Sequence, residues 1–480
     1  MRAGGQVIYG EAFHPHGIAE ALGHDADVHG ADGSADVTGN LLRDGVPFGT
    51  HDTHGWPTFS GWPTHDTNTH QQVYWAWLQR AFLAGERLVV AQAIEDEPIC
   101  KIEPRRSRSC DETEAIRGQI ERLRGLEDYV DAQSGGRGRG WFRLVRNPKR
   151  ARAVIERGKL AVVIGIESSN LFGCSELNDE PQCTRADVDR GIRAYRRLGV
   201  RSLFIAHWVD NAFAGAALEG GDKGAFINVF NRFQTGHYFR TAPCPHPDQG
   251  EEVEPLSPVE AAVLSVYFPA TAPIAAEPPP SYPPGKQCNA KGLTPLGAYL
   301  VRRLIANRML IEVDHLSAAA RERVMEIAER RDYPLVSSHN GTGGHWTKAE
   351  LRRLIDGGGV AAATPDMAPE LAEKIRELGR YRPAVPLGTD TGGFSSLPGP
   401  DERATLPYPF RSYDGEMRFD RQTTGERSFD LNGDGVAHYG LFADLIALME
   451  RGAGGKAATR SLFGSAEAYL RMWERAVRRR

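Results

Sequence analysis

Short apolar runs alternate with amphipathic stretches along most of this 480-residue chain, and this alternation constrains the fold more than any other feature. Eight runs have the β-branched or apolar character of buried strands: Gln6–Phe13, Arg87–Ile94, Leu160–Glu167, Arg201–His207, Met309–His315, Pro334–His339, Gly359–Thr364 and Ala384–Asp390. Stretches with helical spacing lie between them and begin at capping residues such as Thr184 and Thr347. A strand followed by a helix, eight times over, predicts an α/β fold, the (β/α)₈ TIM barrel with long loop insertions.

Two segments are too long for a minimal barrel, although we expect residues 1–480 to form a single domain. Residues 51–77 are crowded with His and aromatic side chains, and residues 214–292 are rich in Pro. Long insertions in a barrel usually form lids or binding loops. We therefore expect 214–292 to be a lid after strand 4 and 51–77 to be a loop after strand 1, whose Trp residues either meet a larger, apolar substrate or simply pack.

The charge balance and hydropathy exclude two classes of partner. There are 58 Lys and Arg against 62 Asp and Glu, a net charge of −4, so no basic surface for nucleic acid is expected. The longest strongly apolar stretch, Leu160–Ile166, is far shorter than the roughly 20 residues of a membrane span. We expect neither nucleic acid nor a membrane span.

Cysteine usage leaves the compartment open. The six cysteines lie at positions 100, 110, 174, 183, 244 and 288. Disulfides between sequence neighbours, which would close short loops, are favoured, and six reduced thiols in a chain long enough to fold without cross-links are the alternative. Residues 1–9 hold no signal-like apolar run. The protein is therefore expected to be secreted or periplasmic with its signal removed, or else cytoplasmic.

Metal-binding and acidic side chains follow most of the predicted strands. The residues at the strand ends are His14 and His16, Glu167, His207, Asp314 and His315, His339, and Asp390. Catalytic groups of barrels lie at the carboxyl ends of the strands, so these side chains are expected to converge. Neutral imidazole and carboxylate are the donors that Zn²⁺ and related divalent ions prefer. This pattern predicts a metal centre at one mouth of the barrel.

Several of these segments, in this order, resemble the signatures of the renal (membrane) dipeptidase family of the amidohydrolase superfamily. They are Gly165-Ile166-Glu167, Gly199-Val200-Arg201 through Ala206-His207, Gly292-Leu293-Thr294-Pro295 through Val313-Asp314-His315-Leu316-Ser317, Val336-Ser337-Ser338-His339 and Leu387-Gly388-Thr389-Asp390. The resemblance covers roughly residues 155–210 and 290–475.

The resemblance implies a cofactor and a role for each matched residue. Glu167 would bridge two divalent metal ions, expected to be zinc, and His315 and His339 would bind the second of them. His207 would contact the substrate and its developing oxyanion, and Asp390 would transfer protons.

The ligands of the first ion are less well matched. The family uses His-x-Asp there, whereas this chain offers His14-x-His16, with His51 and His54 as a rival pair.

The implied activity is hydrolysis of an amide or peptide-type bond of a small-molecule or short peptide-like substrate by a hydroxide that bridges the metal ions. The family places a carboxylate-binding Arg after the motif that ends at His339, but the segment 340–346 here contains none. His54, His345 and Trp346 are candidate substrate-binding residues instead. Phosphoester or lactone hydrolysis on the same scaffold and a non-catalytic metal-binding barrel are the alternatives, and a homo-oligomer is left open.

Overall fold

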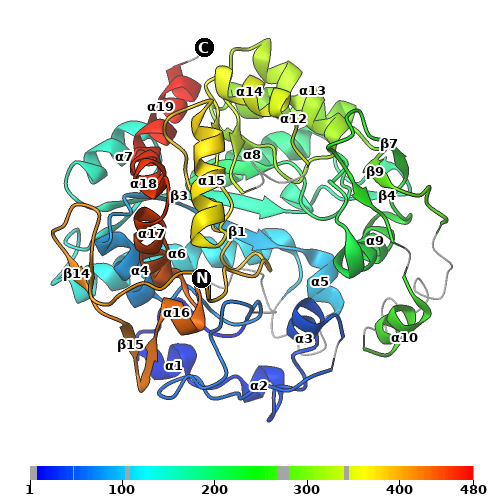
Figure 1. Ribbon diagram of the computed structural model, residues 1–480. Helices are drawn as coiled ribbons and strands as arrows, with labels where there is room; N and C mark the ends of the chain where they lie inside the picture. Colours follow the sequence, from blue (N-terminus) through cyan, green and yellow to red (C-terminus); the bar gives the residue numbers. More distant parts are fainter. Residues whose placement is uncertain are drawn as a thin grey trace.

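A curled sheet of parallel strands lies at the centre of the molecule and is surrounded by helices (Figure 1). The computed structural model describes residues 8–46, 48–102, 109–254, 256–267, 280–339 and 345–478. The strand order is β1-β3-β6-β10-β11-β12, with β2 paired to β3. These strands are β1 (Leu88–Glu95), β2 (Phe142–Val145), β3 (Leu160–Ser168), β6 (Val200–Phe204), β10 (Leu310–Glu312), β11 (Val336–Ser337) and β12 (Val360–Ala361).

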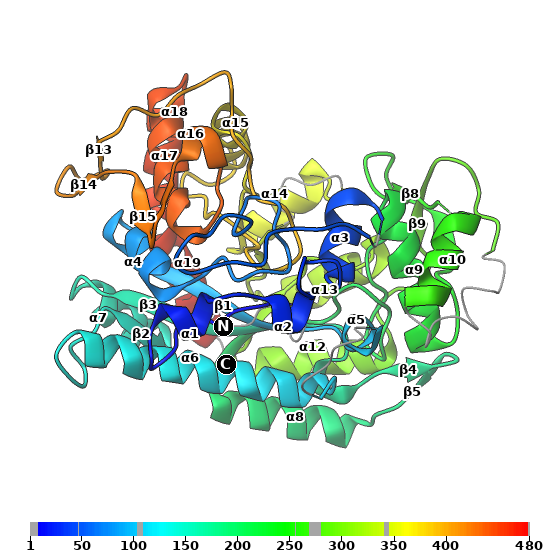
Figure 2. The ribbon, with the colours of Figure 1, turned by 90° about the horizontal axis from the view of Figure 1, so that it is seen from below.

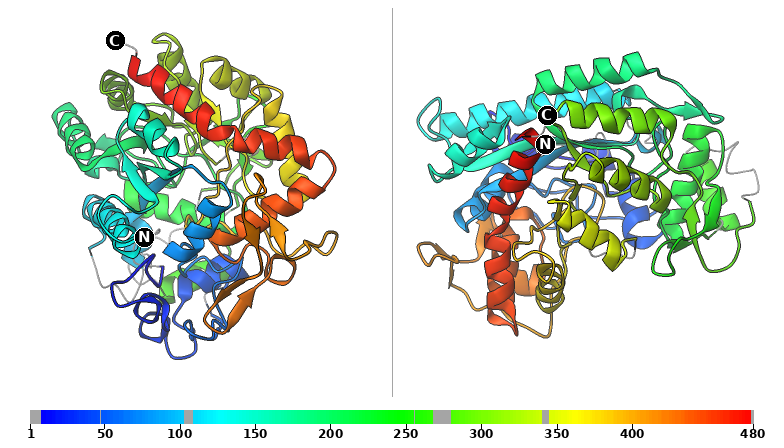
Figure 3. Two further views of the ribbon diagram at one scale, coloured as in Figure 1. Left: turned by 90° about the vertical axis from the view of Figure 1, so that its left-hand side faces the viewer. Right: turned by 90° about the horizontal axis from the view of Figure 1, so that it is seen from above.

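Helices cover the outer face of this sheet, and several of them pack against the strand that comes next in the chain. They are α6 (Glu112–Gln133), α7 (Pro148–Ile155), α8 (Arg185–Leu198), α12 (Pro295–Ala306), α13 (Ala318–Glu329), α14 (Lys348–Asp356) and α19 (Ser465–Arg478). α6 contacts β1, α7 contacts β3 and α8 contacts β6. Figures 2 and 3 show α6 and α8 side by side along one side of the sheet. Because helices shield one face and the interior of the curl lies on the other, β3 is buried along its whole length.

Helix starts lie where the sequence predicts them. Thr184 and Asp187 form a capping box at the start of α8, and Thr347 and Glu350 form another at the start of α14. Each pair satisfies two backbone N–H groups that the first turn of a helix leaves without partners.

The α/β class is therefore confirmed, and six of the eight predicted runs contain strands of the parallel sheet. The run at 384–390 contributes only a parallel bridge between Leu387 and Ala363. β2 was not predicted, because four residues carry too little periodicity to separate them from a loop.

The prediction of a first barrel strand at Gln6–Phe13 is wrong for the part of it that the structure describes. Gln6 and Val7 lie outside the described residues. Tyr9 hydrogen-bonds through its N–H to Thr69 and through its carbonyl to Gln71, so this segment pairs with a loop and not with the sheet. β1 is therefore the first strand of the sheet along the chain.

The described sheet is open between β1 and the segment of Leu387. A cavity of about 220 Å³ occupies the interior, and its lining includes residues from both edges, such as Val90 and Thr389. The curled sheet thus encloses a space that reaches the carboxyl ends of its strands.

The chain before β1 is mostly irregular, and short elements extend the molecule beyond the sheet. The N-terminal helices are α1 (Ile18–Leu22), α2 (Ala26–His29), α3 (Val37–Asp44) and α4 (Trp75–Leu83), followed after β1 by α5 (Glu97–Ile102). The C-terminal elements are α15 (Ala368–Gly379), α16 (Leu431–Asp434), α17 (Phe442–Arg451) and α18 (Gly455–Phe463), with the hairpins β13 (Phe410–Arg411) and β14 (Arg418–Phe419), and β15 (Gln422–Thr424) and β16 (Arg427–Phe429). Trp62 and Trp77 of the aromatic-rich loop are fully buried, which shows that these two pack in the core.

The described residues of the segment 214–292 form a small unit at one end of the sheet (Figure 2). It contains α9 (Gly221–Thr235), α10 (Pro258–Tyr267) and the antiparallel strands β7 (Thr241–Pro243), β8 (Glu251–Glu252) and β9 (Lys286–Asn289). A small hairpin, β4 (Glu176–Leu177) and β5 (Glu180–Pro181), follows β3.

All six cysteines are paired, each with its sequence neighbour. The disulfides are Cys100–Cys110, Cys174–Cys183 and Cys244–Cys288. The last of these lies within the segment 214–292 and joins the chain just after β7 to β9. Among the described residues, no helix is both long and apolar enough to cross a bilayer.

Candidate metal centre

Acidic and imidazole side chains from five neighbouring segments of the sheet lie at the carboxyl ends of its strands. Glu167 is within β3, while His207, His315 and His339 follow β6, β10 and β11 by two or three residues. Asp390 follows the bridge at Leu387. Parallel strands direct all their carboxyl ends to one edge, which is why residues up to 223 positions apart, Glu167 and Asp390, meet here.

Three imidazoles surround one oxygen of Glu167. From Oε1 of this carboxylate, the Nε2 atoms of His315, His339 and His207 lie 3.1, 3.5 and 3.6 Å away. The Nε2 atoms of His315 and His339 are only 2.7 Å apart. The two imidazoles and the carboxylate therefore present their donor atoms to the same small space.

These donors fit a divalent cation. Glu167 Oε1 is buried and has no hydrogen-bond partner. At 2.7 Å, the two Nε2 atoms of His315 and His339 cannot both carry a proton, so at least one directs a lone pair into the space beside Glu167. An unpaired buried carboxylate oxygen is costly unless a cation compensates for it. Carboxylate and neutral imidazole are suitable ligands for zinc and for related ions.

The environment shifts the pKa values of His315 and His207 in opposite directions. Burial lowers the pKa of His315 well below its ordinary value, and the charges of His207 and His339 add to this effect. His207 behaves differently: although burial opposes protonation, the charges of Asp96 and Glu167 raise its pKa to about 9. Asp96 accepts a hydrogen bond of 2.8 Å from His207 Nδ1 and so fixes the ring. At neutral pH His315 thus offers a lone pair while His207 offers an N–H donor.

Asp390 stands beside this group in a strained backbone conformation. Its φ is +45°, in the left-handed region that a residue with a side chain rarely adopts. Burial and the charge of Glu167 raise the pKa of Asp390, while Ser395 donates a 2.7 Å hydrogen bond to its Oδ2. A Cβ on residue 393 would lie 2.0 Å from Asp390 Oδ1, so any residue larger than Gly393 would clash with this carboxylate.

Asp314 positions the imidazole-bearing segments. It is buried, accepts a hydrogen bond of 3.0 Å from the backbone N–H of His339, and accepts others from Ser337 Oγ and Trp346 Nε1. His315, the next residue, has a φ of +61°. Asp314 therefore ties the end of β10 to the end of β11.

The structure does not bring all the predicted site residues together. His14 and His16 lie with their rings 5.3 Å apart on an irregular segment, His16 is exposed, and neither belongs to the group around Glu167. The physical reason is that the segment before them, predicted as the first strand, pairs with the loop at Thr69 and not with the sheet.

His51 and His54, the alternative ligand pair, also lie outside the group around Glu167. His51 Nε2 contacts Asp25, and His54 has a side chain that is 74% exposed and bonded to Asp52. His345 lies 3.9 Å from Glu251 of the segment 214–292. Trp346 is buried, with the guanidinium of Arg321 over its ring, and, among the described residues, it reaches the group only through its Nε1 hydrogen bond to Asp314. Of the segment 340–346, which contains no Arg, residues 340–344 lie outside the described residues.

Two carboxylates at the end of β1 were missed. Glu95 and Asp96 follow the second predicted run directly, and the rule that was applied to the other strand ends would have found them. Glu95 Oε2 is buried without a hydrogen-bond partner, and burial, together with the charges of Asp96 and Glu112, raises the pKa of Glu95 to about 9. These buried carboxyl groups disfavour further negative charge, and Asp96 connects them to the imidazole group through His207.

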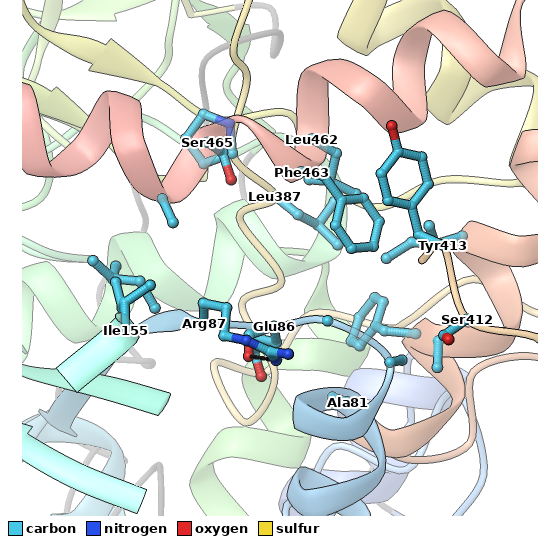
Figure 4. A pocket seen from close by; sticks show the side chains of 18 of the residues that line it. Ala81, Glu86, Arg87, Ile155, Leu387, Ser412, Tyr413, Leu462, Phe463 and Ser465 are labelled. Atoms are coloured by element: carbon cyan, nitrogen blue, oxygen red, sulfur yellow. Dashed lines mark hydrogen bonds between the residues drawn. The ribbon is translucent and has the colours of Figure 1, made fainter. Parts of the chain in front are cut away.

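A larger cavity, of about 480 Å³, lies away from the imidazoles and is lined by residues that precede β1 and by the C-terminal helices. Figure 4 shows Glu86 and Arg87 on one side of it and Leu462 and Phe463 on the other. Glu86 Oε1 accepts a 2.7 Å hydrogen bond from Tyr439, and its Oε2 is buried without a partner. None of the residues that surround Glu167 lines this cavity.

Replacing Glu86 by glutamine is expected to remove a loss of stability that occurs as the pH rises. Burial raises the pKa of Glu86 from its ordinary 4.5 to about 7. The folded state therefore holds a proton that the unfolded state has already released, and the free energy of unfolding falls as the pH rises from about 4.5 to 7. Urea unfolding at pH 5 and pH 8 should show a smaller decrease for Glu86→Gln than for the wild type. An equal decrease would contradict the assignment.

With this geometry in place, the molecule can be described as an α/β protein whose open parallel sheet carries a metal-binding group at the carboxyl ends of its strands. No family model and no curated protein matches its sequence.

Solved structures with a similar arrangement include an amidohydrolase from Pseudomonas aeruginosa, with 14% sequence identity, 83% of this chain and 98% of that chain covered, and a TM-score of 0.42. The probable dipeptidase PvdM from Pseudomonas aeruginosa has 16% identity, covers 85% of this chain and 90% of its own, and has a TM-score of 0.42. A metallopeptidase from Rhodobacter sphaeroides, liganded with a phosphinate mimic of the dipeptide L-Ala-D-Ala, has 14% identity, 83% and 89% coverage and a TM-score of 0.38.

Proposed function

We propose that this protein is a metal-dependent hydrolase that cleaves an amide or peptide-type bond in a small substrate. The observation that carries the proposal is the unpaired, buried Oε1 of Glu167, with three imidazole nitrogens 3.1 to 3.6 Å away and Asp390 beside them. A group that only stabilised the fold would have no need of an unpaired carboxylate oxygen.

Glu167, His315 and His339 would hold the ion, for which zinc is the first candidate because it prefers these donors. When bound, such an ion polarises a carbonyl and lowers the pKa of a water molecule towards 7. Among the described residues, neither His14 nor His16 joins the group, and the proposal for this group is therefore a single ion and not the pair that the resemblance implies.

The protein's own side chains then divide the remaining work. His207 is held by Asp96, is protonated at neutral pH, and donates its Nε2–H to the oxygen that becomes negative as the carbonyl is attacked. Asp390, with its raised pKa, accepts a proton from the attacking water and passes it to the leaving amine. The interior cavity, which is lined by Glu167, His339 and Asp390, gives the substrate access to all three.

The surroundings of the group disfavour added negative charge, and this favours an amide over a phosphoester. Glu95, Asp96 and Glu112 are buried next to one another, and burial together with the charge of Asp96 raises the pKa of Glu112 to about 8. A phosphate group would add negative charge to this environment, whereas an amide adds none. A neutral scissile bond therefore suits the site better.

The proposal is tested by metal analysis together with a substrate panel. Wild-type protein and the variants His315→Ala and His246→Ala are loaded with Zn²⁺, dialysed and assayed on dipeptides, acyl amides, lactones and phosphodiesters. His246, whose side chain is 48% exposed and pairs with Asp248, is the matched control. We expect hydrolysis of amide substrates, lost in His315→Ala together with one bound ion and retained in His246→Ala. Full metal content in His315→Ala, or turnover of phosphodiesters but not amides, would overturn the proposal.

A further inference from the structure

A second group of histidines lies in the irregular N-terminal part of the chain, outside the sheet. Its members are Asp25, His29, His51 and His70, and one ligand atom from each lies within 4.8 Å of the others. Asp25 is the residue before α2 and His29 is the last residue of α2, whereas His51 and His70 come from loops. The group shares no residue with the one around Glu167.

The imidazole nitrogens all converge on one oxygen of Asp25. From Oδ2, His29 Nδ1 lies 2.8 Å away, His51 Nε2 2.8 Å and His70 Nε2 2.5 Å. The nitrogens of His29 and His70 are themselves 3.2 Å apart. In a tetrahedral zinc site with bonds of about 2.0–2.1 Å, neighbouring ligand atoms are about 3.3 Å apart, so these four distances are those of a slightly contracted ligand shell.

The use of only one carboxylate oxygen argues against an ordinary hydrogen-bonded cluster. Asp25 is fully buried, yet its Oδ1 has no hydrogen-bond partner while three nitrogens crowd around Oδ2. A carboxylate that merely accepted hydrogen bonds would distribute donors over both oxygens. A carboxylate that binds a cation through one oxygen, next to three imidazoles, has the asymmetry that is observed.

The surroundings hold the imidazoles in place. Gly33 has a φ of +75°, and a Cβ there would lie 2.4 Å from His51 Nδ1, so the backbone leaves room for this ring only because the residue is glycine. Trp62 stacks on His70 with ring centroids 4.9 Å apart. Asp36 Oδ1 lies 3.7 Å from His29 Nε2, the nitrogen that faces away from the group, as outer carboxylates do in metal sites.

A third group of candidate ligands differs from the Asp25 group in how its carboxylate charge is compensated. Glu176, Asp179 and His237 also lie close together, but the ammonium group of Lys291 pairs directly with Glu176. A cation of the protein itself therefore already compensates for that carboxylate. In the part of the chain that the structure describes, no lysine or arginine pairs with Asp25, and three imidazoles surround its carboxylate.

We propose that Asp25, His29, His51 and His70 form a closed, structural site for a divalent cation such as zinc. Four protein donors complete a tetrahedral shell and leave no position for a substrate, which distinguishes this site from the Glu167 group. Three of the four residues are at most 3% exposed, and none of them lines either of the cavities described above. A bound ion would join three separate stretches of a region that has few regular elements to stabilise it.

The test uses the full chain and counts ions per chain by elemental analysis after loading with Zn²⁺ and gel filtration. We expect two ions in the wild type, one in Glu167→Gln, one in His70→Ala and none in the double variant. The matched control is His54→Ala, three residues from His51 but exposed and outside the group, which should keep both ions. Two ions in folded His70→Ala would overturn the inference.

Because His70→Ala removes a buried side chain and so tests folding as well as binding, the decisive measurement is made on Glu167→Gln, which retains the N-terminal group. Zinc X-ray absorption should show three imidazole nitrogens and one oxygen as ligands, and removal of the ion with a chelator should lower the unfolding midpoint by several degrees. Glu167→Gln protein that binds no zinc, or binds it with other donors, would refute this site. A wild-type protein with a single ion that Glu167→Gln also keeps would instead refute the proposed catalytic site and leave this inference standing.

Discussion

Glu167→Gln is expected to lose its bound ion at the sheet and to lower kcat/KM for an amide substrate by about 10³-fold or more, because a catalytic metal contributes several kcal/mol to transition-state stabilisation. The amide side chain has almost the same shape as the carboxylate but no negative charge, so the fold should persist while the three surrounding imidazoles lose their anionic partner. The measurement combines elemental analysis with steady-state kinetics.

Glu86→Gln is the matched control for this variant. Glu86 also lines the interior cavity, but it bonds to Tyr439 and makes no contact with the imidazole group. The control should retain both metal and activity at neutral pH. Equal activity in Glu167→Gln and the wild type would remove Glu167 from the proposed mechanism.

Asp390→Asn is expected to keep the metal but to lower kcat by about 10²- to 10⁴-fold, the range attributed to a positioned general base. Asparagine keeps the size of the side chain and can still accept a hydrogen bond from Ser395, but it cannot accept the proton of an attacking water. Loss of activity with full metal content separates this role from that of a ligand. Loss of metal in the same proportion as activity would show that Asp390 is a ligand instead.

The pH dependence of kcat is a second test of the role of Asp390 as a base. Asp390 acts as a base only when ionised, so activity should fall as the pH falls through its pKa, which burial and the charge of Glu167 raise. Ser395→Ala removes a hydrogen bond that stabilises the ionised form, which raises this pKa further. The acidic limb of kcat should therefore move to higher pH in Ser395→Ala, with little change at alkaline pH. A shift to lower pH would contradict the role of Asp390.

The part of the fold that the sequence predicts well is the part with strong local signals. Runs such as 160–167 are continuously apolar because both faces of β3 are buried, and the capping boxes at Thr184 and Thr347 mark helix starts by their own side chains. The sequence has no comparable local signal for β2, or for the fact that the first predicted run does not join the sheet. Whether Tyr9 pairs with a strand or with the loop at Thr69 depends on tertiary contacts and not on the local pattern.

The same division holds for the sites. Glu167, His207, His315 and His339 follow predicted strands, and the topology alone brings them together. The group around Asp25 has no such signal, because its histidines are spread over irregular chain without a ligand-spacing motif. Its convergence is visible only in three dimensions.

The segment 214–292 is joined to the ligand-bearing loop after β10. The N–H of Ala217 donates a hydrogen bond of 2.7 Å to the carbonyl of His315, and Ala216 pairs with Leu316. The left-handed backbone at His315 is thus braced from outside the sheet by a unit that the Cys244–Cys288 disulfide cross-links. Reduction of this disulfide would therefore alter the position of the His315 imidazole. Formation of the disulfide and acquisition of the proposed hydrolytic activity would then occur together.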